Sequence, residues 1–243
     1  MKHDRRFLFA SLLFFALVAA LPGQGGDQEN RPPKPGPGPA PGPGGKAFTG
    51  GPTAPDGTRI RCELPGNLHR ENTSSKGLGN CVFTSIHHSA VWQNVPALQE
   101  FPQWLIRKGI PGGGVPSKVD DLIPRMCRER GMPVPDYVQI EDRDLEVLKL
   151  ACRCGRMPGV TYSRSPTGRY GGQVIAHMVN VVHADDRWFV VLDNNYPGED
   201  AYEWMSPRDF LRTYVHPQET AGWSVILLAP PPPPPLVIPQ KKE

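Results

Sequence analysis

The chain has 243 residues, with 27 Lys and Arg against 24 Asp and Glu, which gives a formal net charge of +3. This charge is small and scattered, and basic residues do not alternate with aromatic ones, so we expect no nucleic-acid partner. The 30 prolines and 26 glycines include long Pro/Gly-rich stretches near both ends. Such stretches bury too little apolar surface to fold, so only part of the chain can form a core.

The N-terminus has the pattern of a secretory signal peptide, which we place at residues 1–21. A basic start, Met1–Arg6, precedes a largely apolar run of 14 residues, and Val18-Ala19-Ala20 supplies small residues for cleavage. A membrane-spanning helix needs about 20 apolar residues. We therefore expect a secreted, periplasmic or cell-envelope protein with no membrane span after signal cleavage. An uncleaved N-terminal anchor is the alternative.

The composition predicts one folded domain between two unfolded arms. Residues 22–57 contain 10 Pro and 11 Gly, and we interpret them as a disordered, partly polyproline linker. Residues 230–243 begin with a run of six prolines and form a second disordered, proline-rich arm. Residues 58–229 remain, and about 170 residues is the size of one domain.

Hydrophobic periodicity predicts helices in the first half of this domain and strands in the second. The expected helices cover 81–94, 96–108, 117–130 and 142–152, with a short strand at 137–140. The expected strands cover 160–162, 176–183, 188–193, 201–205 and 223–228, with a short helix at 208–214. Helices followed by an antiparallel sheet are typical of the α+β class. A turn at Asp185-Asp186 predicts that strands 176–183 and 188–193 are neighbours.

Cys81 is the strongest candidate for a reactive side chain. It follows the glycine-rich segment 77–80 and begins the predicted helix 81–94, with Asn80 as the N-cap. The free N–H groups at a helix start favour an anion and lower the pKa of a cysteine, and the thiolate is the nucleophilic form. The small glycines leave the sulfur open to a substrate. A buried structural cysteine is the alternative interpretation.

Residues further along the chain can supply a base and an orienting group. His177 lies at the start of one predicted strand, and Asp193 and Asn194 lie at the end of the next. A histidine can take the proton of a thiol, and a carboxylate or amide on its other ring nitrogen fixes one tautomer. We therefore predict that Cys81, His177 and Asp193 form a catalytic set, with Asn194 as the alternative third member. For each residue taken by itself, the alternative interpretation is that His177 is a core histidine and that Asp193 and Asn194 belong to an ordinary polar turn.

The five cysteines are an odd number for an exported protein, which leaves at least one thiol outside any intrachain disulfide. If Cys81 is free, the other four can form two disulfides, in which Cys152 and Cys154 each pair with Cys62 or Cys127. Reduced, buried thiols are the alternative. The cysteines and histidines have no standard zinc spacing, so we expect no metal.

These motifs resemble the papain-like cysteine peptidases, and among them the bacterial peptidases that cut double-glycine leader peptides of bacteriocins. The similarity rests on Gly79-Asn80-Cys81, on the strand at 177–182, and on 191–193 followed by 205–210. It spans roughly residues 72–228. The resemblance implies a papain-like α+β fold, a peptide or protein substrate, no cofactor and hydrolysis through an acyl-enzyme. Cys81 would be the nucleophile, His177 the base and then the acid, and Asp193 the orienting residue.

One position departs from that family. A glutamine usually lies about six residues before the cysteine and donates to the oxyanion, whereas this chain has Ser75 and Lys76 there. Asn72 and Asn80 are the nearest amides and are the candidate oxyanion donors. Loss of one such donor lowers a rate by about 10²–10³. Two alternatives to a peptidase therefore stay open: an inactive binding module of the same fold, and an acyltransferase or amidase.

Overall fold

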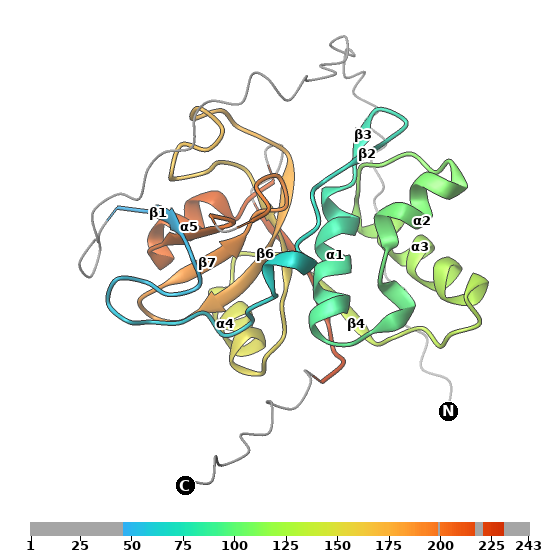
Figure 1. Cartoon of the computed structure of the whole chain (residues 1–243), viewed down its shortest axis with the longest axis horizontal. Helices are drawn as coiled ribbons and strands as arrows, with labels where there is room; N and C mark the ends of the chain where they lie inside the picture. Colours follow the sequence, from blue (N-terminus) through green and yellow to red (C-terminus); the bar gives the residue numbers. More distant parts are fainter. Residues whose placement is uncertain (1–45, 199, 217–220, 231–243) are drawn as a thin grey trace, which may run out of the picture. The chain divides into compact units, whose positions relative to one another are not determined.

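A computed structural model describes residues 46–198, 200–216 and 221–230. Within these residues the protein is mixed α+β, with five α-helices and a seven-stranded antiparallel sheet (Figure 1). The α+β class expected from the sequence is confirmed. The predicted signal peptide, residues 22–45 of the predicted linker, and all of the proline-rich arm beyond Pro230 lie outside the described residues.

The helices are α1 (Cys81–Trp92), α2 (Phe101–Lys108), α3 (Pro116–Glu129), α4 (Leu145–Arg153) and α5 (Pro207–Thr213), with 3-10 turns η2 (Gly66–Leu68) and η3 (Pro96–Leu98). The large sheet contains β1 (Phe48–Gly50), β4 (Tyr137–Asp142), β5 (Gly159–Tyr162), β6 (His177–Ala184), β7 (Phe189–Leu192), β8 (Tyr202–Met205) and β9 (Gly222–Leu227). Its strand order is β1-β8-β7-β6-β5-β9-β4. A separate hairpin pairs β2 (Ser74–Ser75) with β3 (Leu78–Gly79).

Most predicted elements are present with ends shifted by a few residues, but the helix expected at 96–108 is divided. The chain forms η3, leaves the helical conformation at Glu100, whose φ is 59°, and starts again as α2. Pro102 lies in the first turn of α2, where a missing N–H group costs no hydrogen bond. Helix α3 begins at Pro116 rather than being capped by Ser117.

The folded part begins earlier than the predicted boundary at Thr58. Residues 48–50 form β1, which pairs with β8 at the edge of the sheet. Phe48 stacks on Trp204 with ring centroids 5.9 Å apart and meets the edge of Trp188. The glycine and proline content of 22–57 predicted disorder, but this prediction is wrong for residues 48–50. The Phe48 ring contacts and the three paired residues of β1 are enough to fix this segment on the sheet.

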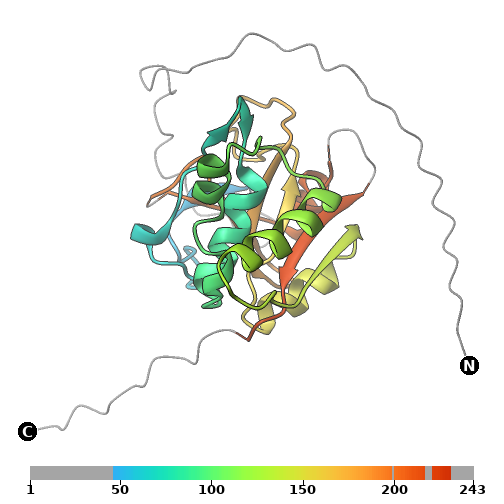
Figure 2. The same cartoon turned by 90° about the vertical axis from the view of Figure 1, so that its right-hand side faces the viewer.

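The sheet is covered by helices on both faces (Figures 1 and 2). One core joins α1, α2 and α3 to Met178 of β6 and to β9. Another joins α4 and α5 to Val179 and Val181 of β6 and to the strands beside it. All eight residues of β6 are buried, as expected for a strand with a packed layer on each side. Beside α1, residues 54–64 pack over β7 and β8.

The alternation along β6 places Asn180 on the side of the strand that faces α1. Asn180 donates to Ser85 O and to Ser89 Oγ of α1, at 3.0 and 3.1 Å. The ring of His88 meets Asn180 Oδ1 at 3.2 Å. These buried polar contacts fix α1 lengthwise against β6, which places the first residue of the helix near the first residue of the strand.

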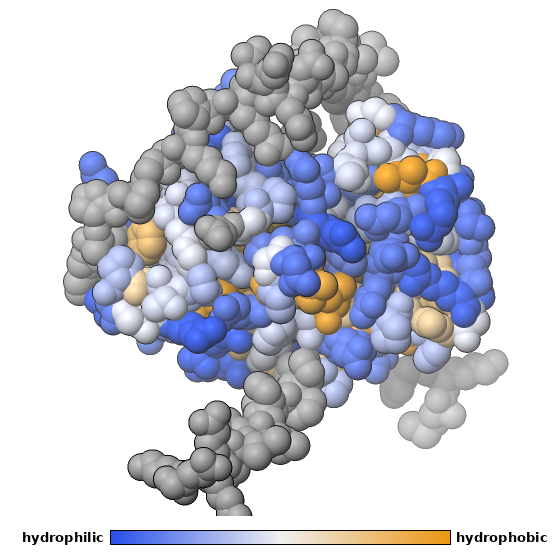
Figure 3. Space-filling view, in the orientation of Figure 1, coloured by the Kyte–Doolittle hydropathy of each residue, from blue (hydrophilic) through white to orange (hydrophobic). Residues whose placement is uncertain are grey.

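The described residues contain no helix that is both long enough and apolar enough to span a membrane. The face seen in Figure 3 is mainly hydrophilic, and the apolar residues visible on it form small, separate patches. Patches of this size are ordinary on a protein surface and do not by themselves indicate a docking site. A cavity lies between the start of α1 and the start of β6.

Candidate functional site

The three residues singled out in the sequence meet at one end of β6 and β7. Cys81 is the first residue of α1, His177 is the first residue of β6, and Asp193 follows directly after β7. Because β6 and β7 are antiparallel, the start of one lies beside the end of the other. Cys81 and His177 line a cavity of about 530 Å³, together with residues of the β2–β3 hairpin and the loop at 170–176.

Asp193 holds His177 by a direct contact. The Nε2 atom of His177 lies 2.9 Å from Oδ1 of Asp193, and the carboxylate is fully buried. The Asn195 N–H also donates to Oδ1 at 2.9 Å, and the Tyr170 hydroxyl donates to Oδ2 at 2.7 Å. Burial alone would raise the pKa of Asp193, but the charge and hydrogen bond of His177, with Arg169 nearby, lower it overall. Asp193 is therefore a carboxylate at neutral pH.

The second ring nitrogen of His177 is left for Cys81, and the two side chains interact closely enough for each to shift the pKa of the other. Burial by itself lowers the pKa of His177, but the Asp193 carboxylate and the Cys81 sulfur together raise it to about 10. Burial raises the pKa of Cys81, but His177 and the backbone N–H groups of Met178 and Val82 lower it overall. The opposite shifts favour a thiolate–imidazolium pair.

Asn194, the alternative third member, does not contact the imidazole. Its Nδ2 donates to Met178 O at 2.9 Å and to Ser85 Oγ at 3.1 Å. The side chain therefore fastens the turn after β7 to α1 and β6. Between the two candidates, Asp193 is the one placed to orient His177.

Of the two candidate oxyanion donors, only Asn72 lines the cavity. Its Nδ2 donates to Asn195 Oδ1 at 3.0 Å, and its buried Oδ1 has no hydrogen-bond partner among the described residues. Asn80 is fully buried behind the helix start. It does not cap α1 through its side chain, and its Nδ2 lies 3.3 Å from Thr73 Oγ1. Asn80 is thus the N-cap residue of α1, as expected, but without a capping hydrogen bond from its side chain, and it does not line the cavity.

The far wall of the cavity is a glycine-rich loop at 111–114. A side chain at Gly114 would collide with Val82, and one at Gly112 would collide with the carbonyl oxygen of Leu78. Lys118 fixes the loop, because its ammonium group donates to the carbonyl oxygens of Pro111, Gly112 and Gly113 at 2.7, 2.6 and 2.8 Å. The wall is thus held close to the helix start that carries Cys81.

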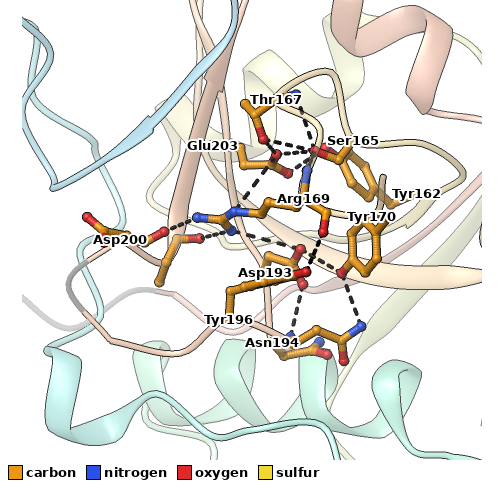
Figure 4. Close-up of polar contacts among 12 residues, drawn as sticks. Tyr162, Ser165, Thr167, Arg169, Tyr170, Asp193, Asn194, Tyr196, Asp200 and Glu203 are labelled. Atoms are coloured by element: carbon orange, nitrogen blue, oxygen red, sulfur yellow. Dashed lines mark hydrogen bonds and ion pairs between the residues drawn. The ribbon is translucent and has the colours of Figure 1, made fainter. Parts of the chain in front are cut away.

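A buried polar cluster behind Asp193 was not predicted from the sequence (Figure 4). Glu203 of β8 accepts from Tyr162 at 2.6 Å and from the hydroxyls of Ser165 and Thr167. The Arg169 guanidinium lies between two fully buried carboxylates, 3.9 Å from Asp193 and 4.0 Å from Glu203. This cluster ties the loop after β5 to the sheet and places the next residue, Tyr170, over Asp193.

The remaining histidines and cysteines offer no metal centre. The described residues contain no group of three or more His, Cys, Asp or Glu that could hold an ion. His87 and His88 are buried and accept hydrogen bonds from backbone N–H groups of Glu100 and Arg70, which indicates neutral, structural rings. All five cysteines are free thiols in the structure, so neither predicted disulfide is formed.

Comparison with known proteins adds no relative to this picture. No family model matches the sequence, and a search of curated proteins gives no match.

Proposed function

We propose that this protein is an exported, papain-like cysteine hydrolase that cleaves peptide bonds, with Cys81, His177 and Asp193 as its catalytic residues. The observation that carries the proposal is that Cys81 and His177 line the same cavity, with His177 held by a 2.9 Å contact to the buried Asp193 carboxylate. A thiolate at a helix start, a buried imidazolium and a buried carboxylate are the parts that nucleophilic catalysis by cysteine requires.

In the first half of the reaction, the Cys81 thiolate attacks the carbonyl carbon of the substrate. A C–S bond forms and the carbonyl electron pair moves to the oxygen, where the Cys81 N–H and one hydrogen of Asn72 Nδ2 are the available donors. The oxyanion then collapses, the C–N bond breaks, and His177 gives its proton to the leaving amine. An acyl-enzyme thioester remains on Cys81.

In the second half, water attacks the thioester while His177 takes its proton. The C–S bond breaks, the carboxylic acid product leaves, and the sulfur departs as the thiolate beside an imidazolium again. Asp193 stays ionised throughout and keeps the same nitrogen of His177 turned toward Cys81. The tight glycine wall fits an extended main chain better than a bulky ligand, which favours a peptide substrate.

An inactive binding module of the same fold is the second candidate. The observation that favours it is the position of Asn72, because one hydrogen of its amide is already engaged by Asn195. A weak oxyanion site would leave Cys81 able to react with alkylating agents but slow to form an acyl-enzyme. The two candidates therefore differ in acylation rather than in thiol activation.

Acylation by p-nitrophenyl acetate separates these candidates. The thiolate attacks the ester carbonyl, the C–O bond breaks and p-nitrophenolate is released, so a stoichiometric burst measures acyl-enzyme formation. We expect a burst in the unmodified protein and in Cys154→Ser, the control that removes an exposed thiol, and none in Cys81→Ala. A protein without a burst, or a burst that survives in Cys81→Ala, would contradict the proposed hydrolase.

A further inference from the structure

Four side chains form one hydrogen-bonded series along the cavity wall. The Tyr170 hydroxyl donates to Asp193 Oδ2 at 2.7 Å (Figure 4). The same hydroxyl oxygen accepts from Asn195 Nδ2 at 3.0 Å. Asn195 Oδ1 in turn accepts from Asn72 Nδ2 at 3.0 Å. Tyr170, Asn195 and Asn72 all line the cavity, whereas Asp193 is fully buried beneath it.

The direction of each hydrogen bond in this series is set by its neighbour. Asp193 is a carboxylate and can only accept, so Tyr170 must give it the single hydroxyl proton. The Tyr170 oxygen is then left to accept, which turns Asn195 so that its Nδ2 faces Tyr170 and its Oδ1 faces Asn72. Asn72 must therefore present its Nδ2 end on the Asn195 side.

The unpartnered Oδ1 of Asn72 supports this order. The atom is buried and has no hydrogen-bond partner among the described residues. A buried acceptor without a partner is unfavourable, so the amide of Asn72 does not lie in the orientation that best satisfies its own two ends. Its orientation is therefore set by Asn195, and a functional role is one of the explanations for a buried polar atom left without a partner.

The position of Tyr170 is fixed by its neighbours Arg169, Tyr196 and His177. Arg169 stacks on the ring of Tyr196, with its guanidinium carbon 4.8 Å from the ring centroid, and the Tyr196 hydroxyl donates to the Arg169 carbonyl at 2.5 Å. The Tyr170 ring meets Tyr196 edge-on at 5.5 Å and His177 at 6.0 Å. The hydroxyl of Tyr170 therefore has little freedom to leave Asp193.

We propose that Tyr170 and Asn195 are positioning residues that couple the two halves of the site, so that one series of hydrogen bonds orients the Asp193–His177 pair and the Asn72 amide together. This inference rests on the proposed function, and it goes further by assigning roles to two residues that do not take part in bond making. Tyr170 serves both halves of the site, whereas the side chain of Asn195 serves only the Asn72 half. The Asn195 backbone N–H contacts Asp193 and is unchanged by substitution.

Two reagents distinguish the two halves of the site, the Cys81–His177–Asp193 half and the Asn72 half. Iodoacetamide alkylates the thiolate by displacement of iodide and forms no oxyanion, so its rate reports the Cys81–His177–Asp193 half alone. Acylation by p-nitrophenyl acetate passes through an oxyanion and needs both halves. The ratio of the two rates therefore distinguishes loss of one half of the site from a general loosening of the fold, because loosening would not change this ratio in one consistent direction.

We expect Tyr170→Phe to slow both reactions about tenfold or more, because the Phe ring keeps the packing but removes the hydroxyl. Asn195→Ala should slow acylation by a similar factor and leave alkylation within about twofold of the unmodified protein. Tyr137 lies on the distant strand β4, and its hydroxyl donates to Asp120 of α3. Tyr137→Phe removes this hydroxyl, and as the matched control it should change neither rate. Thermal unfolding and near-ultraviolet circular dichroism report whether each variant is folded.

The outcomes separate this inference from the function on which it rests. Slow alkylation and no burst in the unmodified protein would overturn both. Normal rates in the unmodified protein with unchanged rates in Tyr170→Phe, or equal slowing of both reactions in Asn195→Ala, would overturn the coupling alone. Loss of acylation with intact alkylation in Asn195→Ala, in a folded variant, is the result that the coupling requires.

Discussion

The paired shifts of Cys81 and His177 are the central feature of this protein at the scale of residues. The pKa of the thiol is lowered and that of the imidazole is raised to about 10. These opposite shifts favour the charged pair, and the pair is lost when either partner loses its charge. Activity should rise as Cys81 loses its proton and fall as His177 loses its own at high pH.

Asp193→Asn tests the source of the raised pKa of His177. The negative charge of Asp193 is the strongest influence that raises this pKa against burial, so an uncharged amide should lower it from about 10 toward the ordinary value near 6.5. Nitrogen-15 NMR of the imidazole follows the titration directly. An unchanged His177 titration in Asp193→Asn would show that Asp193 does not govern the ring.

Cys81, His177 and Asp193 could be chosen as candidate site residues because each has a local signature in the sequence. Cys81 follows a glycine turn and begins a helix, His177 is the first residue of a strand, and Asp193 is at the polar end of the next strand. Tyr170 and Glu203 have no such signature. Tyr170 lies in a polar loop with no periodicity, and Glu203 alternates with apolar residues in β8 as an exposed residue would. Only the three-dimensional contact between that loop and β8 gives them a role.

At the scale of elements, the attachment of α1 to β6 positions the site, and it is made by buried polar groups. Burial, the largest influence, lowers the pKa of His87 to about 4 and that of His88 to about 3. In the unfolded chain both would titrate near 6.5. Both rings are therefore neutral in the folded protein over a range in which the unfolded chain binds protons.

This difference predicts a loss of stability in acid. A folded-state pKa below the unfolded value stabilises the protein above about pH 6.5, and the stabilisation is lost as pH falls toward 4, by about 1.4 kcal/mol per pH unit for each histidine. His87→Asn keeps an acceptor for the Glu100 N–H and removes one titrating group. Denaturant unfolding at several pH values should show a shallower slope in this variant, and an identical slope would contradict the assignment.

The shortest strands were harder to predict than the strands at the centre of the large sheet. β5, β6 and β7 are buried runs of apolar residues and were recognised as strands from the sequence, with the β6–β7 turn at Asp185-Asp186. β1, β2 and β3 have two or three residues each and contain Gly or Ser. Strands this short take their conformation from the partner strand rather than from their own sequence.

At the scale of the whole molecule, the sheet order could not be predicted because it depends on distant pairings. β9, near the end of the described chain, inserts between β5 and β4, and β1 pairs with β8 across most of the sequence. The loop after β5 likewise contacts Asp193 at the end of β7 and Glu203 of β8, and these contacts form the network behind Asp193. The fold class can be predicted from the order of helices and strands along the chain. The contacts that hold Asp193 depend on how the strands are arranged in the sheet, which that order does not give.

The distribution of thiols over the molecule makes Cys81 a measurable target. Burial raises the pKa of Cys62 to about 12 and raises that of Cys127 and Cys152, so these three should react slowly in the folded protein. Cys154 is exposed and should react with alkylating agents. In a Cys154→Ser background, native labelling should therefore report Cys81 alone, and the modified residue can be verified by peptide mass spectrometry.

The most direct test of the proposed function is the pH dependence of iodoacetamide labelling at Cys81 in that background, with and without His177→Ala. We predict fast labelling well below pH 7 when His177 is present, because the thiolate persists there as part of the ion pair. With His177→Ala, the rate below pH 7 should collapse and follow an ordinary thiol with a pKa near 8.5. The same slow labelling in both proteins, with an ordinary thiol pKa, would mean that the cavity holds no activated nucleophile.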